Sequence, residues 1–373
     1  MANDSNNLSE TNEEVIDEDE LLEAADESTS LSYFGTDLDV SGLVRRLKNG
    51  DIVVPNFDPQ VETGSKLHGF QRKFVWKKQQ MDRFIESLLI GYPVPGIFLV
   101  QEKNNVLLVL DGQQRLKTLE EFYLGDDVGK PFELSNVSKI FKGLTYDKLE
   151  AEDRRKLDNT FIHATIVKYN PDDPEEREGV YQVFERLNSS GTILQPHEIR
   201  VALSMGPFVE LLRDLNEYSS WRELYGKISP RLRDQELILR FFALLEESRK
   251  YSRPLKVFLN NFLEKKKMMT PEQYASQVNL FQDMSDIVLK AIGKKAFKPT
   301  SPQVNAAIFD SVAIGIATRL KNGPIADYKA LAAAYERLLS NDKYEVAVGR
   351  STADEEQVRT RLRLASEAFN VVK

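Results

Sequence analysis

The segment VLLVLDGQQRLKTLEEFYLG, residues 106–125, joins an apolar run directly to a helical pattern. The five apolar residues are typical of a buried strand, and Leu116, Leu119 and Phe122 then recur on one side of a helix. A strand that leads straight into a helix belongs to a fold in which helices pack against a sheet. The sequence therefore predicts a mixed α/β layer around this junction.

The hydrophobic periodicity divides the rest of the chain into two parts. It predicts strands alternating with helices up to about residue 170, and almost only helices from Pro174 onward. The expected elements of the first part are a helix and a strand within 41–54, a helix over 78–90, and strands at 96–100, 106–110 and 161–169. We therefore predict the α+β class, with an acidic disordered tail over 1–32, a mixed α/β domain over 33–172 and an all-helical domain over 173–373.

The charge of the chain is unevenly distributed. Residues 1–30 carry eleven Asp and Glu and no Lys or Arg, so the formal net charge of −8 becomes about +3 for residues 31–373. An acidic tail repels itself and buries little surface, which favours disorder. The alternative is a nucleic-acid mimic that shields a basic groove until it is displaced.

Several classes of protein are excluded or disfavoured by what the sequence lacks. Without Cys there are no disulfides, no Cys-ligated zinc sites and no thiol nucleophile. No apolar run is long enough for a membrane helix, and the first residues do not resemble a secretory signal, so we expect a cytoplasmic protein with no membrane partner. There is no Walker A loop, and the three His at 68, 163 and 197 are too dispersed for an HNH nuclease.

The polar residues at the strand–helix junction suggest an anion site. The free N–H groups and the dipole of a helix N-terminus favour a phosphate, and Gly112 would let it approach the backbone. Arg115 could grip the phosphate, Asp111 could hold Mg²⁺ or orient a water, and Gln113 and Gln114 could hydrogen-bond to phosphate, base or water. The simpler alternative is that Asp111 caps the helix and pairs with Arg115, with both glutamines on the surface.

Two further stretches carry similar ambiguity. Between residues 70 and 78, four basic residues alternate with three aromatic ones, which suits contacts with nucleic-acid backbone and bases but also fits a strand with aromatic core residues. The turn NSSG at 188–191 is rich in hydrogen-bond donors and could wrap phosphates or simply link two helices. Arg186 and Arg200 on either side of this turn are secondary candidates.

The sequence DGQQR after an apolar strand resembles the signature of the ParB/sulfiredoxin-like domain at the front of GmrSD-type, modification-dependent restriction endonucleases. The resemblance extends over roughly residues 40–320. It includes, in the family's order, LVRRLKNGDIVVPNF, FQRKFVWKKQQMDRFIESLLIGYPVPGIFL, VLLVLDGQQRLKTL and VFERLNSSGTILQPHEIR, with echoes in QELILRFFAL, RPLKVFLNNFLEK and NAAIFDSV.

This resemblance implies a nucleotide-handling fold in which DGQQR supports hydrolysis of a nucleoside triphosphate. It also implies that the family's QR-x-x-x-W stretch senses modified DNA or couples it to the nucleotide. The residues expected in these roles are Asp111, Gln114 and Arg115 for catalysis, Gly112, Gln113, Arg72, Asn188, Ser190 and Gly191 for nucleotide binding, Gln71, Lys73, Trp76 and Lys77 for DNA binding, and Asp111 for Mg²⁺.

The chain departs from many relatives because no HNH-type segment follows the helical part. We therefore expect a DNA-targeted, nucleotide-hydrolysing component of a restriction or phage-defence system, with the nuclease encoded as a separate subunit. The alternatives are a non-catalytic nucleotide- or DNA-binding regulatory subunit and a DNA-nicking enzyme. A homo-oligomer is compatible with the sequence. Arg359, Arg361 and Arg363 are weaker candidates for DNA contact, because they would spread over two faces of a solvated helix.

Overall fold

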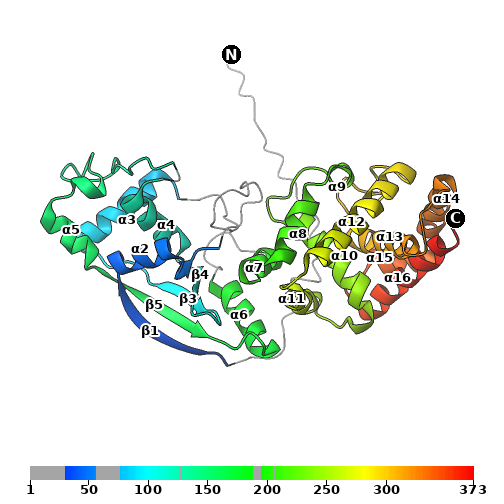
Figure 1. The fold of residues 1–373 in the computed structure, drawn as a ribbon, viewed down its shortest axis with the longest axis horizontal. Coiled ribbons are helices and arrows are strands. Elements are labelled where there is room, and N and C mark those ends of the chain that lie inside the picture. The colour runs from blue at the N-terminus through cyan, green and yellow to red at the C-terminus, as the bar shows by residue number, and fades with distance from the viewer. Residues whose placement is uncertain (1–29, 56–75, 127, 188–194, 205) are drawn as a thin grey trace, which may run out of the picture. The chain divides into compact units, whose positions relative to one another are not determined.

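The computed structural model describes residues 30–55, 76–126, 128–187, 195–204 and 206–373. These residues form two compact units, each described here by itself. The first, called the α/β unit, comprises Glu27–Val209 with Pro230–Leu232, and the second, called the helical unit, comprises Glu210–Ser229 and Arg233–Lys373. Mixed strands and helices therefore precede a long helical part, which confirms the predicted fold class (Figure 1).

The α/β unit contains one five-stranded sheet in the order β1-β5-β3-β4-β2. The β1–β5 and β3–β4 pairs are antiparallel, whereas β2–β4 and β3–β5 are parallel. Its elements are β1 (Ser32–Asp39), α2 (Val40–Asn49), β2 (Ile52–Val53), α3 (Lys78–Ile90), β3 (Ile97–Gln101), β4 (Leu107–Asp111), α4 (Gln113–Leu124), α5 (Ala151–Asp158), β5 (Phe161–Lys168), α6 (Pro174–Leu187) and α7 (Pro196–Leu203).

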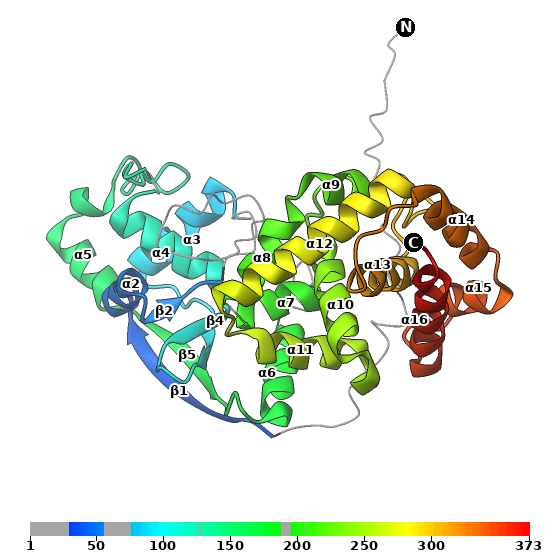
Figure 2. The same ribbon diagram turned by 45° about the vertical axis from the view of Figure 1, so that its right-hand side comes forward.

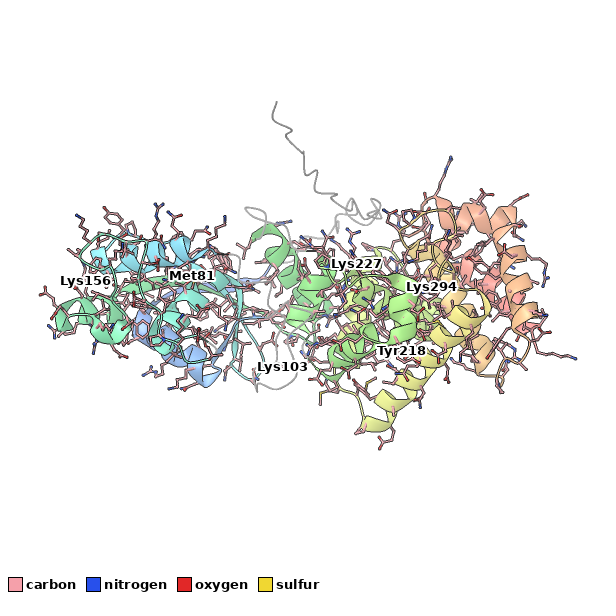
Figure 3. The ribbon with its side chains drawn as sticks, turned by 90° about the horizontal axis from the view of Figure 1, so that it is seen from above. Met81, Lys103, Lys156, Tyr218, Lys227 and Lys294 are labelled. Carbon is pink, nitrogen blue, oxygen red and sulfur yellow. The ribbon has the colours of Figure 1, made fainter. Side chains whose placement is uncertain are left out.

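One face of the sheet and the helices α2 to α5 share a hydrophobic core. Alternate residues of β5, namely Ile162, Ala164 and Ile166, point into it, as the two-residue period of a strand requires. The helices contribute apolar stripes, among them the predicted stripe of α3, whose Met81 is buried in this core (Figure 3). Each fully buried aliphatic side chain stabilises the fold by about 1.5–3 kcal/mol.

The strand β4, which lies between β3 and β2, is buried on both faces. Leu107, Leu108, Val109 and Leu110 are all buried, and α6 packs against this strand. A strand covered on both sides needs a continuous apolar run rather than alternation, which explains why VLLVL precedes the DGQQR segment.

The helix and strand predictions for the α/β unit are confirmed, but two of its elements, β1 and α5, were not predicted. The helix α3 covers Lys78–Ile90 as expected and ends at Gly91, whose φ of 84° is left-handed. The strand β1 was not predicted, because its residues SYFGTDLD are mostly exposed and include Gly and Asp, which disfavour strands. Its extended conformation depends on pairing with β5, more than 120 residues along the chain.

The helices α6 and α7 belong to the compact unit that contains the sheet. The division between the two units falls within α8 (Pro207–Asn216), whereas the sequence-based boundary was placed at residue 172. Periodicity distinguishes helices from strands but does not show which core a helix contributes to, and α6 buries part of its surface against β4.

A buried carboxylate anchors the loop that follows α4. Asp82 of α3 is fully buried and accepts hydrogen bonds from the backbone N–H, hydroxyl and amide groups of Ser135 and Asn136 at 2.7–3.3 Å, and it also contacts Lys78. Burial alone raises the pKa of Asp82, but the hydrogen bonds from Lys78, Asn136 and Ser135 outweigh burial. The pKa of this carboxyl therefore lies below its ordinary value of 3.8.

Replacing Asp82 with Asn is expected to reduce the free energy of unfolding of the α/β unit by about 2 kcal/mol at pH 7, since hydrogen bonds to a buried charge are lost. Because the folded pKa of Asp82 is lowered, its contribution is complete above about pH 4 and is lost as the pH falls through the folded value. Denaturant titrations of both proteins from pH 7 to pH 3 should show the difference narrowing at the acid end. A constant difference would contradict this account.

The helical unit consists of α8 (from Glu210), α9 (Ser219–Tyr225), α10 (Arg233–Glu247), α11 (Leu255–Lys266), α12 (Pro271–Ala291), α13 (Ala306–Leu320), α14 (Tyr328–Leu339), α15 (Asp342–Gly349) and α16 (Glu355–Asn370). Figure 2 shows α13 and α16 side by side in this unit. Its core is rich in aromatic residues packed around Trp221, which is fully buried. Within the described part of the chain, no helix is long and apolar enough to cross a membrane.

The expectation for the three arginines of α16 is wrong at one position. Arg361 is 1% exposed and donates to Asp310 of α13 at 3.0 Å, so it is neither solvated nor accessible to DNA. Arg359 and Arg363 are exposed and pair with Glu355 and Glu367 on the same helix. A basic residue in a polar helix looks solvated in sequence, and only the buried partner on another helix shows otherwise.

Candidate functional site

Gly112 makes the turn between β4 and α4. Its φ of 97° and ψ of 9° are left-handed, and it occupies the N-cap position of α4. A Cβ at this position would lie 2.5 Å from Cγ2 of Ile97 on β3, so both the conformation and the space require glycine. No side chain caps the helix at this point. The alternative in which Asp111 caps α4 is therefore wrong, because the cap residue is Gly112 and Asp111 still belongs to the strand.

Arg115 joins three elements of the α/β unit through a single guanidinium nitrogen. Its Nη2 donates to Oδ2 of Asp111 at 2.8 Å and to the carbonyl oxygen of Gly96, just before β3, also at 2.8 Å. The pairing with Asp111 that the simpler alternative predicted is thus confirmed. The Arg115 side chain is 14% exposed and that of Asp111 is 42% exposed. The arginine is therefore mainly enclosed, while the carboxylate remains accessible.

Part of the Arg115 guanidinium has no protein partner within the described residues. Its Nε is buried and makes no hydrogen bond there. A buried N–H without an acceptor is costly, because it has given up its hydrogen bonds to water. Oδ1 of Asp111 likewise makes no hydrogen bond in this part of the chain, because the pair with Arg115 uses Oδ2.

Gln114 lies in the first turn of α4 and reaches the residues before α3. Its Oε1 accepts the backbone N–H of Trp76 at 3.1 Å, and its backbone carbonyl accepts the hydroxyl of Thr118 at 2.7 Å. The Trp76 ring packs edge-on against Phe84, with centroids 5.5 Å apart, and is partly buried against the core. This packing favours the core alternative for Trp76 over a ring that is open to DNA bases.

The other described candidates lie at different degrees of exposure. Lys77 is exposed and precedes α3, where its backbone N–H donates to Oε1 of Gln80 at 2.9 Å. Gln113 is partly exposed as the first residue of α4, Arg186 is exposed on α6, and Arg200 is fully buried in α7. The candidates outside the described residues are Gln71, Arg72, Lys73, Asn188, Ser190 and Gly191.

The structure brings Asp111, Gly112, Gln114, Arg115 and the backbone of Trp76 together at the start of α4. The residue that sequence analysis missed is Gly96. Its contribution is a carbonyl oxygen, which any residue could provide. Only the pairing of β3 with β4 brings it to the end of the DGQQR segment. The sequence placed Gly96 only at the start of the strand predicted at 96–100, and it gave no reason to expect that its carbonyl oxygen would contact Arg115.

The donor set at Asp111 is compatible with Mg²⁺ bound together with a nucleotide. Among the residues that the structure describes, no group of three or more His, Asp or Glu could hold a metal ion. Mg²⁺ is commonly bound by one or two carboxylates, with phosphate oxygens and waters completing the shell. Asp111 provides one accessible carboxylate, so the residues fit a nucleotide-dependent ion rather than a separate metal cage.

A comparison with known families finds a similarity over the segment that contains this site. Residues 43–205 match the family model described as GmrSD restriction endonuclease, N-terminal domain. No curated protein matches the chain. A solved structure of a Pnob8-like ParB-N domain is similar, with 10% identity, 89% of this chain and 99% of that chain covered, and a TM-score of 0.21. This TM-score is too low to support a conclusion, and the fold class rests on the strands and helices themselves. Residues 43–205, which include the start of α4, are therefore similar to the N-terminal domain of GmrSD restriction endonucleases.

Proposed function

We propose that this chain is a DNA-targeted component of a restriction-type defence system, and that its α/β unit binds and hydrolyses a nucleoside triphosphate at the start of α4. One observation carries the proposal. Within a segment similar to the GmrSD N-terminal domain, the N-terminus of α4 has no side-chain cap and lies beside an accessible carboxylate and an enclosed guanidinium. An uncapped helix N-terminus favours an anion, and the arginine adds positive charge to the same place.

The residues of the junction have separable roles in this proposal. The first-turn amides of α4 bind phosphate oxygens. Gly112 has no side chain, so the phosphates can approach the backbone closely. Arg115 holds Asp111 in place through Nη2 and contributes its charge to the site. Asp111 keeps Oδ1 for a water or for Mg²⁺, which would offset the charge of the phosphates. Gln114 supports the turn by holding the backbone of Trp76, rather than acting on the nucleotide through Oε1.

A second candidate function is nucleotide binding without hydrolysis, in a regulatory subunit. The observation that favours it is the state of Arg115, whose Nη2 is already shared between Asp111 and the Gly96 carbonyl. A guanidinium held by the protein in this way has less freedom to follow the charge that develops during phosphoryl transfer. In both versions DNA is the target.

Replacing Asp111 with Asn is expected to lower nucleotide hydrolysis about 100-fold, in the range that general acid–base or metal-supporting groups provide. The measurement is phosphate release from ATP, GTP, CTP and UTP with Mg²⁺, with and without modified DNA. Asp172→Asn is the matched control, because Asp172 is exposed in the same unit and its carboxylate pairs with the exposed Lys103. Equal turnover in wild type and Asp111→Asn would remove the proposed site, and tight binding without turnover in the wild type would select the regulatory subunit.

A further inference from the structure

The strand β1 forms an open edge of the sheet. Its eight residues pair with β5 along one side, and β5 is its only strand partner within the described part of the chain. Both ribbon views show β1 as the outermost strand of the α/β unit (Figures 1 and 2). An edge strand presents alternate N–H and C=O groups that can pair with a further strand. The opposite edge, β2, has only two residues and offers little for such pairing.

β1 lacks several of the features with which proteins normally protect an edge. Its sequence SYFGTDLD contains no Lys, Arg or Pro, and its register with β5 shows no bulge. Tyr33 and Phe34 are 73% and 40% exposed. The two carboxylates are used within the chain, because Asp37 pairs with His163 at 2.9 Å and Asp39 caps α2 through the N–H of Gly42 at 2.6 Å. Both carboxylates therefore already have partners within the chain.

The order of side chains along β1 favours pairing with β1 of a second copy of the chain, in the antiparallel direction. The aromatic residues occupy its first half and both acids its second half. A parallel pair of two β1 strands would place Asp37 and Asp39 against their own copies, and like charges directly opposite are destabilising. An antiparallel pair centred on Thr36 places Phe34 opposite Leu38 of the other copy. It also sets the acid-bearing half of each strand against the acid-free half of the other.

We propose that β1 pairs with β1 of a second copy of this chain, antiparallel and two-fold symmetric about Thr36, so that one sheet runs through a dimer. The two-fold arrangement is closed, because the same edge is used by both copies and none is left for a third. The Phe34–Leu38 pair occurs twice, and the Thr36 side chains meet at the axis, where Thr–Thr pairs are favourable.

The absence of Cys from the chain allows a direct test of this register. In Thr36→Cys, opposite Cα atoms of the two copies would be about 4.5–5.5 Å apart, which lies within disulfide reach. In Ser32→Cys, on the same strand, the two sulfurs would be separated by about 27 Å at roughly 3.4 Å per residue. Mild oxidation of the full-length proteins should therefore cross-link Thr36→Cys and leave Ser32→Cys monomeric on non-reducing gels. Cross-linking of both would indicate parallel pairing and overturn the proposal.

Light scattering gives an independent measurement on the unmodified chain. Wild type is expected to have the mass of a dimer, and Phe34→Lys, which puts a charge on the edge, should shift it to monomer with unchanged circular dichroism. Ile140→Lys is the matched control, because Ile140 is 72% exposed in the same unit but lies outside the sheet. A monomeric wild type, or a dimer that survives Phe34→Lys and fails to cross-link at residue 36, would overturn the proposal.

Discussion

Replacing Asp310 with Ala is expected to lower the free energy of unfolding of the helical unit by about 3–5 kcal/mol. Asp310 of α13 is fully buried and accepts hydrogen bonds from Arg240 of α10 at 2.8 and 3.3 Å and from Arg361 of α16 at 3.0 Å. Removing the carboxylate would leave two buried guanidiniums without their shared counter-charge. Burial already lowers the pKa of Arg361, and Asp310 works against that effect.

The measurement requires a signal from the helical unit alone. The chain has two tryptophans, and Trp221 is fully buried in this unit, so a Trp76→Phe background makes fluorescence specific for its unfolding in denaturant. Glu367→Ala is the matched control, because it removes an arginine–carboxylate pair on the exposed side of α16, and such pairs are worth less than about 1 kcal/mol. If Asp310→Ala and Glu367→Ala lowered the free energy of unfolding by similar amounts, the buried contacts of Asp310 with Arg240 and Arg361 would not be important for the stability of the helical unit.

The regular elements of the α/β unit could be predicted because their signals are local. The apolar stripe and terminal glycine of α3, and the apolar run of β4, each lie within a short stretch of sequence. The strand β1 could not be predicted in the same way, since its conformation depends on β5. The burial of Arg361 was missed for the same reason, because its partner Asp310 lies 51 residues away on another helix.

The candidate site shows the same division between local and non-local information. The residue types at the junction and the contact between Asp111 and Arg115 follow from a spacing of four residues. The acceptor at Gly96 and the bond between Gln114 and the backbone of Trp76 do not, because each depends on the packing of separate elements. The sequence therefore indicated which residues belong to the site, and the fold shows that Arg115 and Gln114 also hold the site together.

Replacing Gly112 with Ala is expected to destabilise the α/β unit by at least about 3 kcal/mol and to abolish nucleotide hydrolysis. A left-handed conformation costs a residue with a Cβ about 1–2 kcal/mol. The new Cβ would also lie 2.5 Å from Cγ2 of Ile97 and 3.2 Å from Nη2 of Arg115, so the turn would have to shift away from β3. The shift would separate Arg115 from Asp111 and from Gly96, and the start of α4 would lose its position.

Gly50→Ala separates the two causes, because Gly50 follows α2 in the same unit with φ 76° and has nothing within 4 Å of an added Cβ. Gly50→Ala should lower the free energy of unfolding only by the cost of the left-handed conformation, about 1–2 kcal/mol. Unfolding of the α/β unit can be followed by Trp76 fluorescence in a Trp221→Phe background. If the clash with Ile97 dominates, Ile97→Ala should lower the free energy of unfolding less in the Gly112→Ala protein than in the wild type. A double-mutant cycle measures this difference. Equal costs for Gly112→Ala and Gly50→Ala would mean that the close approach of β3 does not shape this turn.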